Sequence, residues 1–123
     1  MKIKESAENY LETILMLKNK KGYVRSIDVA NELGFSKPSV SVAMKNFREE
    51  GYILVDSDGG ISLTDKGMSV AERVFERHQL IARALMLLGV SESVAFEDSC
   101  KIEHDISEET FEKLKTFMKD KRV

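Results

Sequence analysis

The chain has 123 residues, of which 42% are apolar and 33% charged, and this balance favours a soluble, helix-rich protein over a disordered one. No apolar run approaches the roughly 18 residues that cross a bilayer, and no signal peptide is visible, so we expect a cytoplasmic protein with no membrane partner. A net charge of −2 is not the basic balance of a typical nucleic-acid binder, but residues 18–25 and 37–48 each contain basic residues and no acid.

Three helices are predicted in the first fifty residues. Apolar side chains at helical spacing indicate the first helix over residues 5–20. Ser26 has the character of an N-cap for a short second helix, which a glycine ends. Ser36 caps a third helix that runs to about Glu50, and Pro38 lies in its first turn, where a missing backbone N–H is harmless.

The hydrophobic pattern then changes from a helical to a strand period. Apolar and polar residues alternate on either side of a glycine-rich turn at residues 56–60, which predicts a two-stranded hairpin. A threonine caps a long helix over residues 64–88. Two shorter helices are expected over residues 91–104 and 107–121, with Ser107 as the cap of the second.

Short helix, glycine turn, capped helix and hairpin, in that order, are typical of a winged helix-turn-helix. We therefore predict a mainly α protein, with a winged helix-turn-helix DNA-binding domain over residues 1–67 and a second, helical domain over residues 68–123. The third helix would enter the major groove through the small and basic residues of its first turns. The expected contacts with double-stranded DNA are Ser36, Lys37, Pro38, Ser39, Ser41, Lys45 and Arg48.

The hairpin turn carries Asp56 and Asp58, which repel phosphate, so we expect this wing to add little DNA affinity. A three-helix bundle whose hairpin binds protein has the same order of elements. The turn glycine, the acid-free third helix and the hairpin that follows agree with one another and favour DNA binding.

Half of a metal site is indicated in the second domain. On a helix, Cys100 projects from the same side as Glu103 and His104, which follow it at helical spacing. A thiolate, a carboxylate and an imidazole on one face suit a divalent transition metal, but such ions usually take roughly four to six donors. Further donors must therefore come from other segments.

Two further candidate donors are His78 and Glu12. His78 lies on the apolar face of the long helix, where a lone histidine is more often a hydrogen-bonded core residue than a ligand. A Cys-Glu-His face packed against it would reverse that expectation. Glu12 borders the apolar stripe of the first helix, one turn after Glu8 and close in phase to Asn9, and its alternative is an ordinary solvated carboxylate.

The counts of cysteine and histidine limit the chemistry. One cysteine excludes an internal disulfide and a Cys-only zinc site, and two histidines exclude a His-rich site. A nucleophilic Cys100 needs a base and an oxyanion hole, and no glycine-rich loop flanks it. We therefore expect no enzymatic activity and no small-molecule substrate, and an inert buried thiol is a further alternative for Cys100.

Five segments carry a resemblance to a known family. They are Glu8-Asn9-Tyr10-Leu11-Glu12, Ser36-Lys37-Pro38-Ser39-Val40-Ser41, Leu63-Thr64-Asp65-Lys66-Gly67, Arg77-His78 and Cys100-Lys101-Ile102-Glu103-His104. Through them the chain resembles, along nearly its whole length, the metal-dependent repressors of the diphtheria toxin repressor/manganese transport regulator family.

The resemblance implies a homodimer that binds operator DNA when loaded with Fe(II) or Mn(II) and so represses genes of metal homeostasis. The second domain would then bind the metal and form the dimer, and the chain resembles the short form without an SH3-like domain. By position, the metal ligands that the resemblance implies are Asn9, Glu12, His78, Cys100, Glu103 and His104.

Departures from the two branches of the family bear on the metal. At Cys100 the chain resembles the iron branch, because the manganese branch has a carboxylate at that position. At Glu12 the chain instead resembles the manganese branch. Asn9 replaces the Asp or Met of the two branches. Phe96 and Ala82 stand where the iron branch has further ligands, so the resemblance does not extend to that ancillary site.

The soft thiolate of Cys100 favours Fe(II), with Mn(II) next, and Zn(II), Co(II) or Ni(II) as ions that bind in vitro. The alternative to a metal-responsive repressor is a winged-helix regulator that senses an organic ligand, in which the Cys-Glu-His face has only a structural role.

Overall fold

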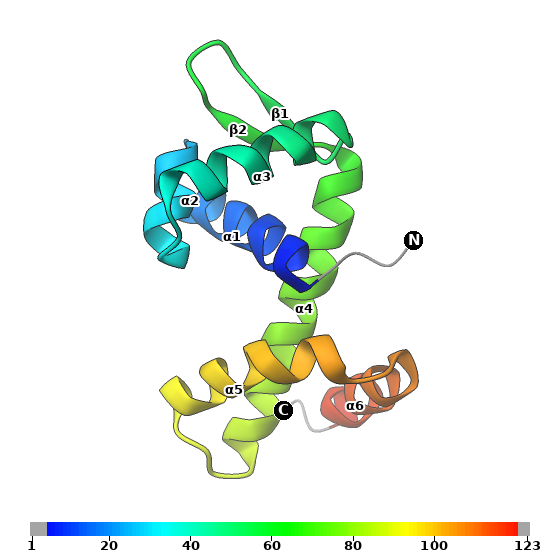
Figure 1. Ribbon diagram of the computed structural model, residues 1–123. Helices are drawn as coiled ribbons and strands as arrows, with labels where there is room; N and C mark the ends of the chain where they lie inside the picture. The colour runs from blue at the N-terminus through cyan, green and yellow to red at the C-terminus, as the bar shows by residue number, and fades with distance from the viewer. Residues whose placement is uncertain (1–4, 121–123) are drawn as a thin grey trace. The chain divides into compact units, whose positions relative to one another are not determined.

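The computed structural model describes residues 5–120, and these form a mainly α protein with one small hairpin (Figure 1). The predicted order of three helices, a hairpin and further helices is confirmed. The elements are α1 (Glu5–Lys21), α2 (Ser26–Leu33), α3 (Lys37–Glu49), β1 (Ile53–Val55), β2 (Ile61–Leu63), α4 (Asp65–Leu87), α5 (Glu92–Asp105) and α6 (Glu108–Asp120).

The chain divides into two compact units, one up to Arg73 and the other from Val74, so the boundary falls inside α4. The assignment of separate roles to residues 1–67 and 68–123 stays a prediction. Within the part of the chain that the structure describes, no helix is both long and apolar enough to span a membrane.

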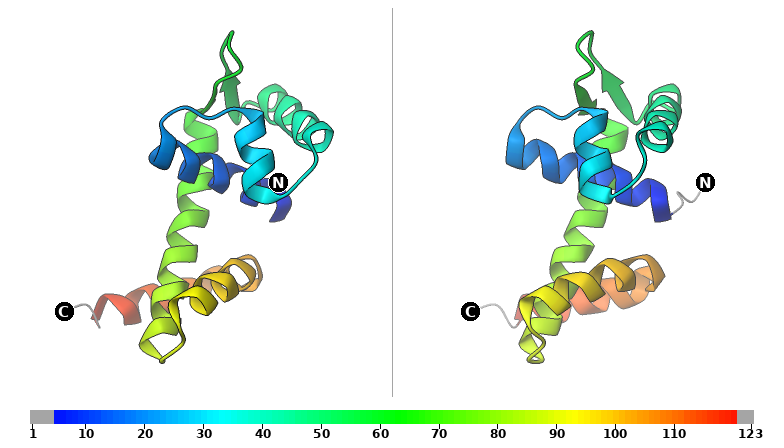
Figure 2. Two further views of the ribbon diagram at one scale, coloured as in Figure 1. Left: turned by 90° about the vertical axis from the view of Figure 1, so that its left-hand side faces the viewer. Right: turned by 60° about the vertical axis from the view of Figure 1, so that its left-hand side comes forward.

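In the first unit, α1, α2, α3 and the hairpin enclose a core of fully buried aliphatic side chains. Tyr10 of α1 adds edge-to-face ring contacts, with centroid distances of 5.7 Å to Phe35 and 5.6 Å to Phe47. Figure 2 shows α3 beside α2 and next to the hairpin, in agreement with their packing contacts. The largest fully buried side chains of this unit are Leu11, Ile14, Val24, Val29, Val40, Ile53 and Ile61.

The prediction that Ser26 caps α2 is wrong, because the N-cap is Arg25 and Ser26 is the first helical residue. The Asp28 carboxylate accepts a hydrogen bond from the Arg25 backbone N–H at 2.9 Å and so satisfies this donor from inside the helix. Lys21 donates to the other Asp28 oxygen at 2.7 Å, and this bond, followed by the one from Arg25, holds the pKa of Asp28 below its usual value. Gly34 ends the helix in the left-handed region, at a φ of 71°.

The caps of α3, α4 and α6 are as predicted. Ser36 accepts a hydrogen bond from the Ser39 backbone N–H at 3.3 Å, and Thr64 accepts one from the Gly67 N–H at 3.1 Å. Ser107 in the same way accepts from the Thr110 N–H at 3.1 Å. These caps fix where each helix begins.

The hairpin is antiparallel, with Ile53 opposite Leu63 and Val55 opposite Ile61. Its turn is closed by Asp56, whose carboxylate accepts hydrogen bonds from the backbone N–H groups of Gly60 at 2.8 Å and Asp58 at 2.9 Å. The Gly60 N–H is the main cause that holds the pKa of Asp56 below its usual value.

In the second unit, the C-terminal half of α4 packs with α6 around Leu80, Phe111 and Met118, and Ile106, directly after α5, packs against this cluster. Arg77 of α4 joins these helices, because its guanidinium donates to the Ile106 carbonyl at 3.0 Å and lies 5.0 Å from the centre of the Phe111 ring. This packing fixes the face of α4 on which His78 lies.

Candidate functional site

His78 occupies the buried face of α4, with 6% of its surface exposed. Its Nε2 atom lies 3.1 Å from the Phe96 carbonyl oxygen, and its ring meets the Phe96 ring edge-on at a centroid distance of 5.6 Å. The histidine is therefore held by α5 in one orientation. Which ring nitrogen carries the proton decides whether Nε2 donates to Phe96 or is an acceptor.

Cys100 comes from α5 and meets the same histidine. Its Sγ atom lies 3.2 Å from His78 Nε2 and 3.8 Å from Nδ1, and the residue is exposed. The alternative of an inert buried thiol is therefore wrong. Cys100 and His78, which come from two helices far apart in the sequence, are therefore close enough to bind one metal ion together.

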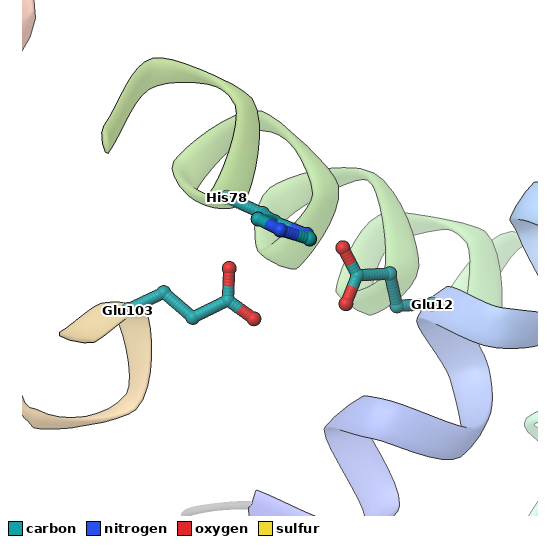
Figure 3. A group of neighbouring side chains, drawn as sticks. All are labelled: Glu12, His78 and Glu103. Carbon is teal, nitrogen blue, oxygen red and sulfur yellow. The ribbon is translucent and has the colours of Figure 1, made fainter. Parts of the chain in front are cut away.

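Glu103 and His104 follow on the same helix, one turn beyond Cys100. A carboxylate oxygen of Glu103 lies within 4.8 Å of a ring nitrogen of His78, and Figure 3 shows the two side chains facing one another. Glu103 Oε1 is 3.4 Å from Nε2 of His104, and their side chains are 1% and 4% exposed. The buried Glu103 carboxylate thus lies between the imidazoles of His78 and His104, while the role of these residues as ligands stays a prediction.

The set of donors fits a divalent transition ion. Neutral imidazole, carboxylate and thiolate are ligands of such ions, and Glu103 is a buried carboxylate beside a buried histidine. A buried carboxylate is costly unless it is compensated by charge or hydrogen bonds. A bound dication would compensate the charges of both Glu103 and the Cys100 thiolate.

The two candidate donors of α1 belong to the first unit. Glu12, which Figure 3 also labels, is 5% exposed, and Asn9 is half-buried. The reading of Glu12 as an ordinary solvated carboxylate is therefore wrong.

The predicted DNA contacts lie on the solvent-facing side of α3. Its opposite face is buried through Val40, Met44 and Phe47, so the packing sets which residues are presented outward. Ser36 and Ser39 are joined by a 2.8 Å bond between their hydroxyls. All of the predicted contacts are exposed, namely Ser36, Lys37, Pro38, Ser39, Ser41, Lys45 and Arg48.

Sequence reasoning missed two groups on this surface. Ser26 and Ile27 of α2 line a hollow of about 240 Å³ together with Lys37 and Ser41 of α3. Val42, at the middle of α3, is 60% exposed. The helical period of α3 places Val42 on the outward face, and this signal was present in the sequence.

Comparison with known proteins gives the family. The model described as "Iron dependent repressor, N-terminal DNA binding domain" matches residues 2–61, and "Iron dependent repressor, metal binding and dimerisation domain" matches residues 64–123. The chain belongs to the iron-dependent repressor family. The resemblance to the diphtheria toxin repressor/manganese transport regulator proteins is thereby confirmed.

A protein named as an uncharacterised HTH-type transcriptional regulator of Methanocaldococcus jannaschii is 35% identical over 116 residues, which are 93% of either chain. The structure of the manganese regulator SloR is similar with a TM-score of 0.78 and 28% identity, over 97% of this chain and 55% of that one. The metal-dependent transcriptional regulator MtsR gives 0.83 and 25%, over 92% and 53%. This chain thus spans about half the length of these two regulators.

These likenesses establish a DNA-binding, metal-binding transcriptional regulator of the repressor type. The family and the relative from Methanocaldococcus jannaschii are transcriptional regulators. The winged helix-turn-helix followed by a helical domain is the fold that the solved relatives share.

Proposed function

We propose that this protein is a metal-responsive repressor that binds operator DNA as a homodimer when loaded with Fe(II) or Mn(II), and so controls genes of metal-ion homeostasis. The observation that carries the proposal is the meeting of Cys100 and His78 at 3.2 Å, with the buried Glu103 carboxylate facing the same imidazole. Residues 1–67 would read the DNA, and residues 68–123 would hold the metal and the dimer.

The proposed ligands come from both units. His78, Cys100, Glu103 and His104 are the donors of α4 and α5, and Glu12, with Asn9 as a further candidate, is the donor of α1. When bound, the ion supplies positive charge that compensates the carboxylates and the thiolate. Because Glu12 and His78 belong to different units, shared ligation would restrict the orientation of the DNA-binding unit and favour its DNA-competent states.

The proposed metal is iron, with manganese as the second choice. Cys100 provides a thiolate, which is softer than a carboxylate and suits Fe(II), Co(II), Ni(II) and Zn(II) better than Mn(II). Glu12 and Glu103 provide hard oxygens, which suit Mn(II), and the similarity to the manganese regulator SloR supports that second choice. Selectivity in a cell also depends on which ions are available.

The proposed homodimer forms through the second unit. Phe111 and Met118 are buried within this unit and are therefore not available for an interface. Leu87, Leu88, Val94 and Phe117 are exposed, by 64%, 81%, 46% and 55%. A dimer with two-fold symmetry would present one α3 to each half of a symmetric operator.

The experiment is DNA binding under anaerobic, reducing conditions, with and without added Fe(II) or Mn(II). The proposal predicts that metal raises affinity for a selected duplex, and that His78→Ala and Glu103→Ala lose the metal effect while keeping the helical circular dichroism of the wild type. Glu97→Gln, on the exposed side of α5, is the matched control and should respond as the wild type does. Equal DNA affinity of the wild type with and without either metal would contradict the proposal.

A further inference from the structure

Val42 lies in the middle of α3 and is 60% exposed. The orientation of this helix is fixed, because Val40, Met44 and Phe47 are buried on its other side. A single exposed valine is common on protein surfaces and needs no explanation by itself. Its surroundings, however, are those of a surface that reads DNA.

The neighbours of Val42 on the helical face are polar or basic. Ser39 and Pro38 lie one turn before it, and Lys45 and Asn46 lie one turn after it, all of them exposed. This part of the chain matches the DNA-binding domain of the iron-dependent repressors. Val42 is thus an apolar side chain at the centre of a cationic and hydrogen-bonding face whose partner is a polyanion.

The major groove of DNA offers one prominent apolar group at the base edges, which is the 5-methyl group of thymine. Resting on the proposed operator binding, we propose that Val42 is a specificity-determining residue that contacts a thymine methyl in each half-site. Valine has no hydrogen-bonding group, so it cannot read the donors and acceptors of a base edge. Contact with a methyl group is the recognition chemistry left to it.

Valine is suited to this contact by its stiffness. A β-branched side chain on a helix keeps one strongly preferred χ1 rotamer, so its two methyl groups are positioned before DNA binds and little side-chain entropy is lost. Ser39 and Lys45, on the adjacent turns, would hold the helix against phosphates and base edges and so bring Val42 to the floor of the groove.

The test uses duplexes selected from a randomised pool by the metal-loaded wild type. Each thymine of the selected duplex is then replaced by deoxyuridine, which removes only the 5-methyl group. The inference predicts one thymine per half-site at which the replacement weakens wild-type binding by about fourfold, the value expected for one buried methyl group. In Val42→Ala the same replacement should change affinity by less than about twofold, because the partner methyls are gone.

Two controls make the comparison specific. Met16→Ala removes an exposed apolar side chain of α1 and should keep the full sensitivity to deoxyuridine. Val42→Thr keeps the β-branch and one methyl and should keep part of it. Equal sensitivity in the wild type and in Val42→Ala, or no sensitive thymine in the wild type, would overturn the inference while leaving operator binding in place. Selection of no duplex at all would overturn the proposed function, and this inference with it.

Discussion

The Sγ atom of Cys100 lies 3.2 Å from Nε2 of His78, so α5 and α4 bring a thiol and an imidazole together across 22 residues of sequence. The buried carboxylate of Glu103 faces the same ring. These three donors lie within one compact unit of the chain.

Replacement of Cys100 should shift the metal preference. Cys100→Glu replaces a soft donor by a hard one and should move relative affinity toward Mn(II), whereas Cys100→Ser should weaken Fe(II) more than Mn(II). Loss of a hydrogen bond that only supports a metal ligand already lowers metal affinity by about tenfold to a hundredfold. Because Cys100→Ser removes a proposed ligand itself, we expect it to lower Fe(II) affinity by at least about tenfold. Anaerobic titration of both ions measures the ratio.

The control for this series is the wild type oxidised in air, in which the Cys100 thiol has been converted to an oxidised form that no longer provides a thiolate. Its relative affinity for Fe(II) and Mn(II) should resemble that of Cys100→Ser. An Fe(II)/Mn(II) ratio that is the same in Cys100→Glu as in the wild type would show that the thiol does not set the preference.

The basic residues of α3 should contribute to DNA affinity through phosphate. Lys45→Ala and Lys37→Ala should each weaken binding of all sequences alike, and each should reduce the slope of log K against log salt by about 1. Lys101→Ala, an exposed lysine of α5, should leave the slope unchanged. If the DNA affinities of both α3 variants equal that of the wild type at low and at high salt, α3 is not the helix that approaches the phosphates.

Sequence alone predicted the order of the elements and most of the caps, because Ser36, Thr64 and Ser107 stand directly before apolar periods. It failed at Ser26, because the N-cap is one residue earlier, at Arg25, whose backbone N–H donates to the Asp28 carboxylate that Lys21 also holds. The burial of Glu12 was also out of reach, since sequence period shows which face a residue is on but not how deeply the neighbouring elements cover it. The sequence-based list of DNA contacts did not include Val42, because that list was built on the hydroxyl and basic side chains of the third helix and on Pro38 in its first turn.

Asp28→Asn should destabilise the first unit in a pH-dependent way. Lys21 and the Arg25 N–H lower the pKa of Asp28, so its stabilisation is present above the pKa of the unfolded chain, about 3.9, and is lost as pH falls through the lower folded value. With a partly exposed pair we expect about 0.5–1 kcal/mol at pH 7. Thermal unfolding of both proteins should show the difference shrinking below about pH 4.

Asp58→Asn is the matched control for that measurement, because it removes the same charge from an exposed turn. A destabilisation by Asp28→Asn that is as large at pH 3 as at pH 7 would show that the carboxylate charge is not the cause.

Gly60→Ala should distort the hairpin turn. A Cβ atom at this position would overlap the Tyr23 ring and the Asp56 carboxylate, which the Tyr23 hydroxyl contacts at 3.2 Å. Forcing a methyl group into such a contact costs about 1–3 kcal/mol, and chemical denaturation measures it. Ser57→Ala, at an exposed position of the same turn, should change stability little, and equal stability of Gly60→Ala and the wild type would contradict the geometry of the turn.

Exposed leucines of the second unit should hold the dimer. Leu87→Ser and Leu88→Ser remove side chains that are 64% and 81% exposed and should raise the fraction of monomer at micromolar concentration, without loss of helical content. Leu54→Ser, a similarly exposed leucine of the hairpin, is the control and should leave the dimer intact. Sedimentation that shows a wild-type monomer with metal present would contradict the proposed dimer.

The most direct measurement of the central claim is the metal affinity with and without operator DNA. If metal binding favours the DNA-competent state, DNA must in turn tighten metal binding by the same factor by which metal tightens DNA binding. Anaerobic calorimetric titration of Mn(II) into the protein and into its complex with a selected duplex gives both affinities. The account predicts tighter binding in the complex, by the factor found when DNA affinity is measured with and without Mn(II). Equal Mn(II) affinity in the two titrations would contradict the account.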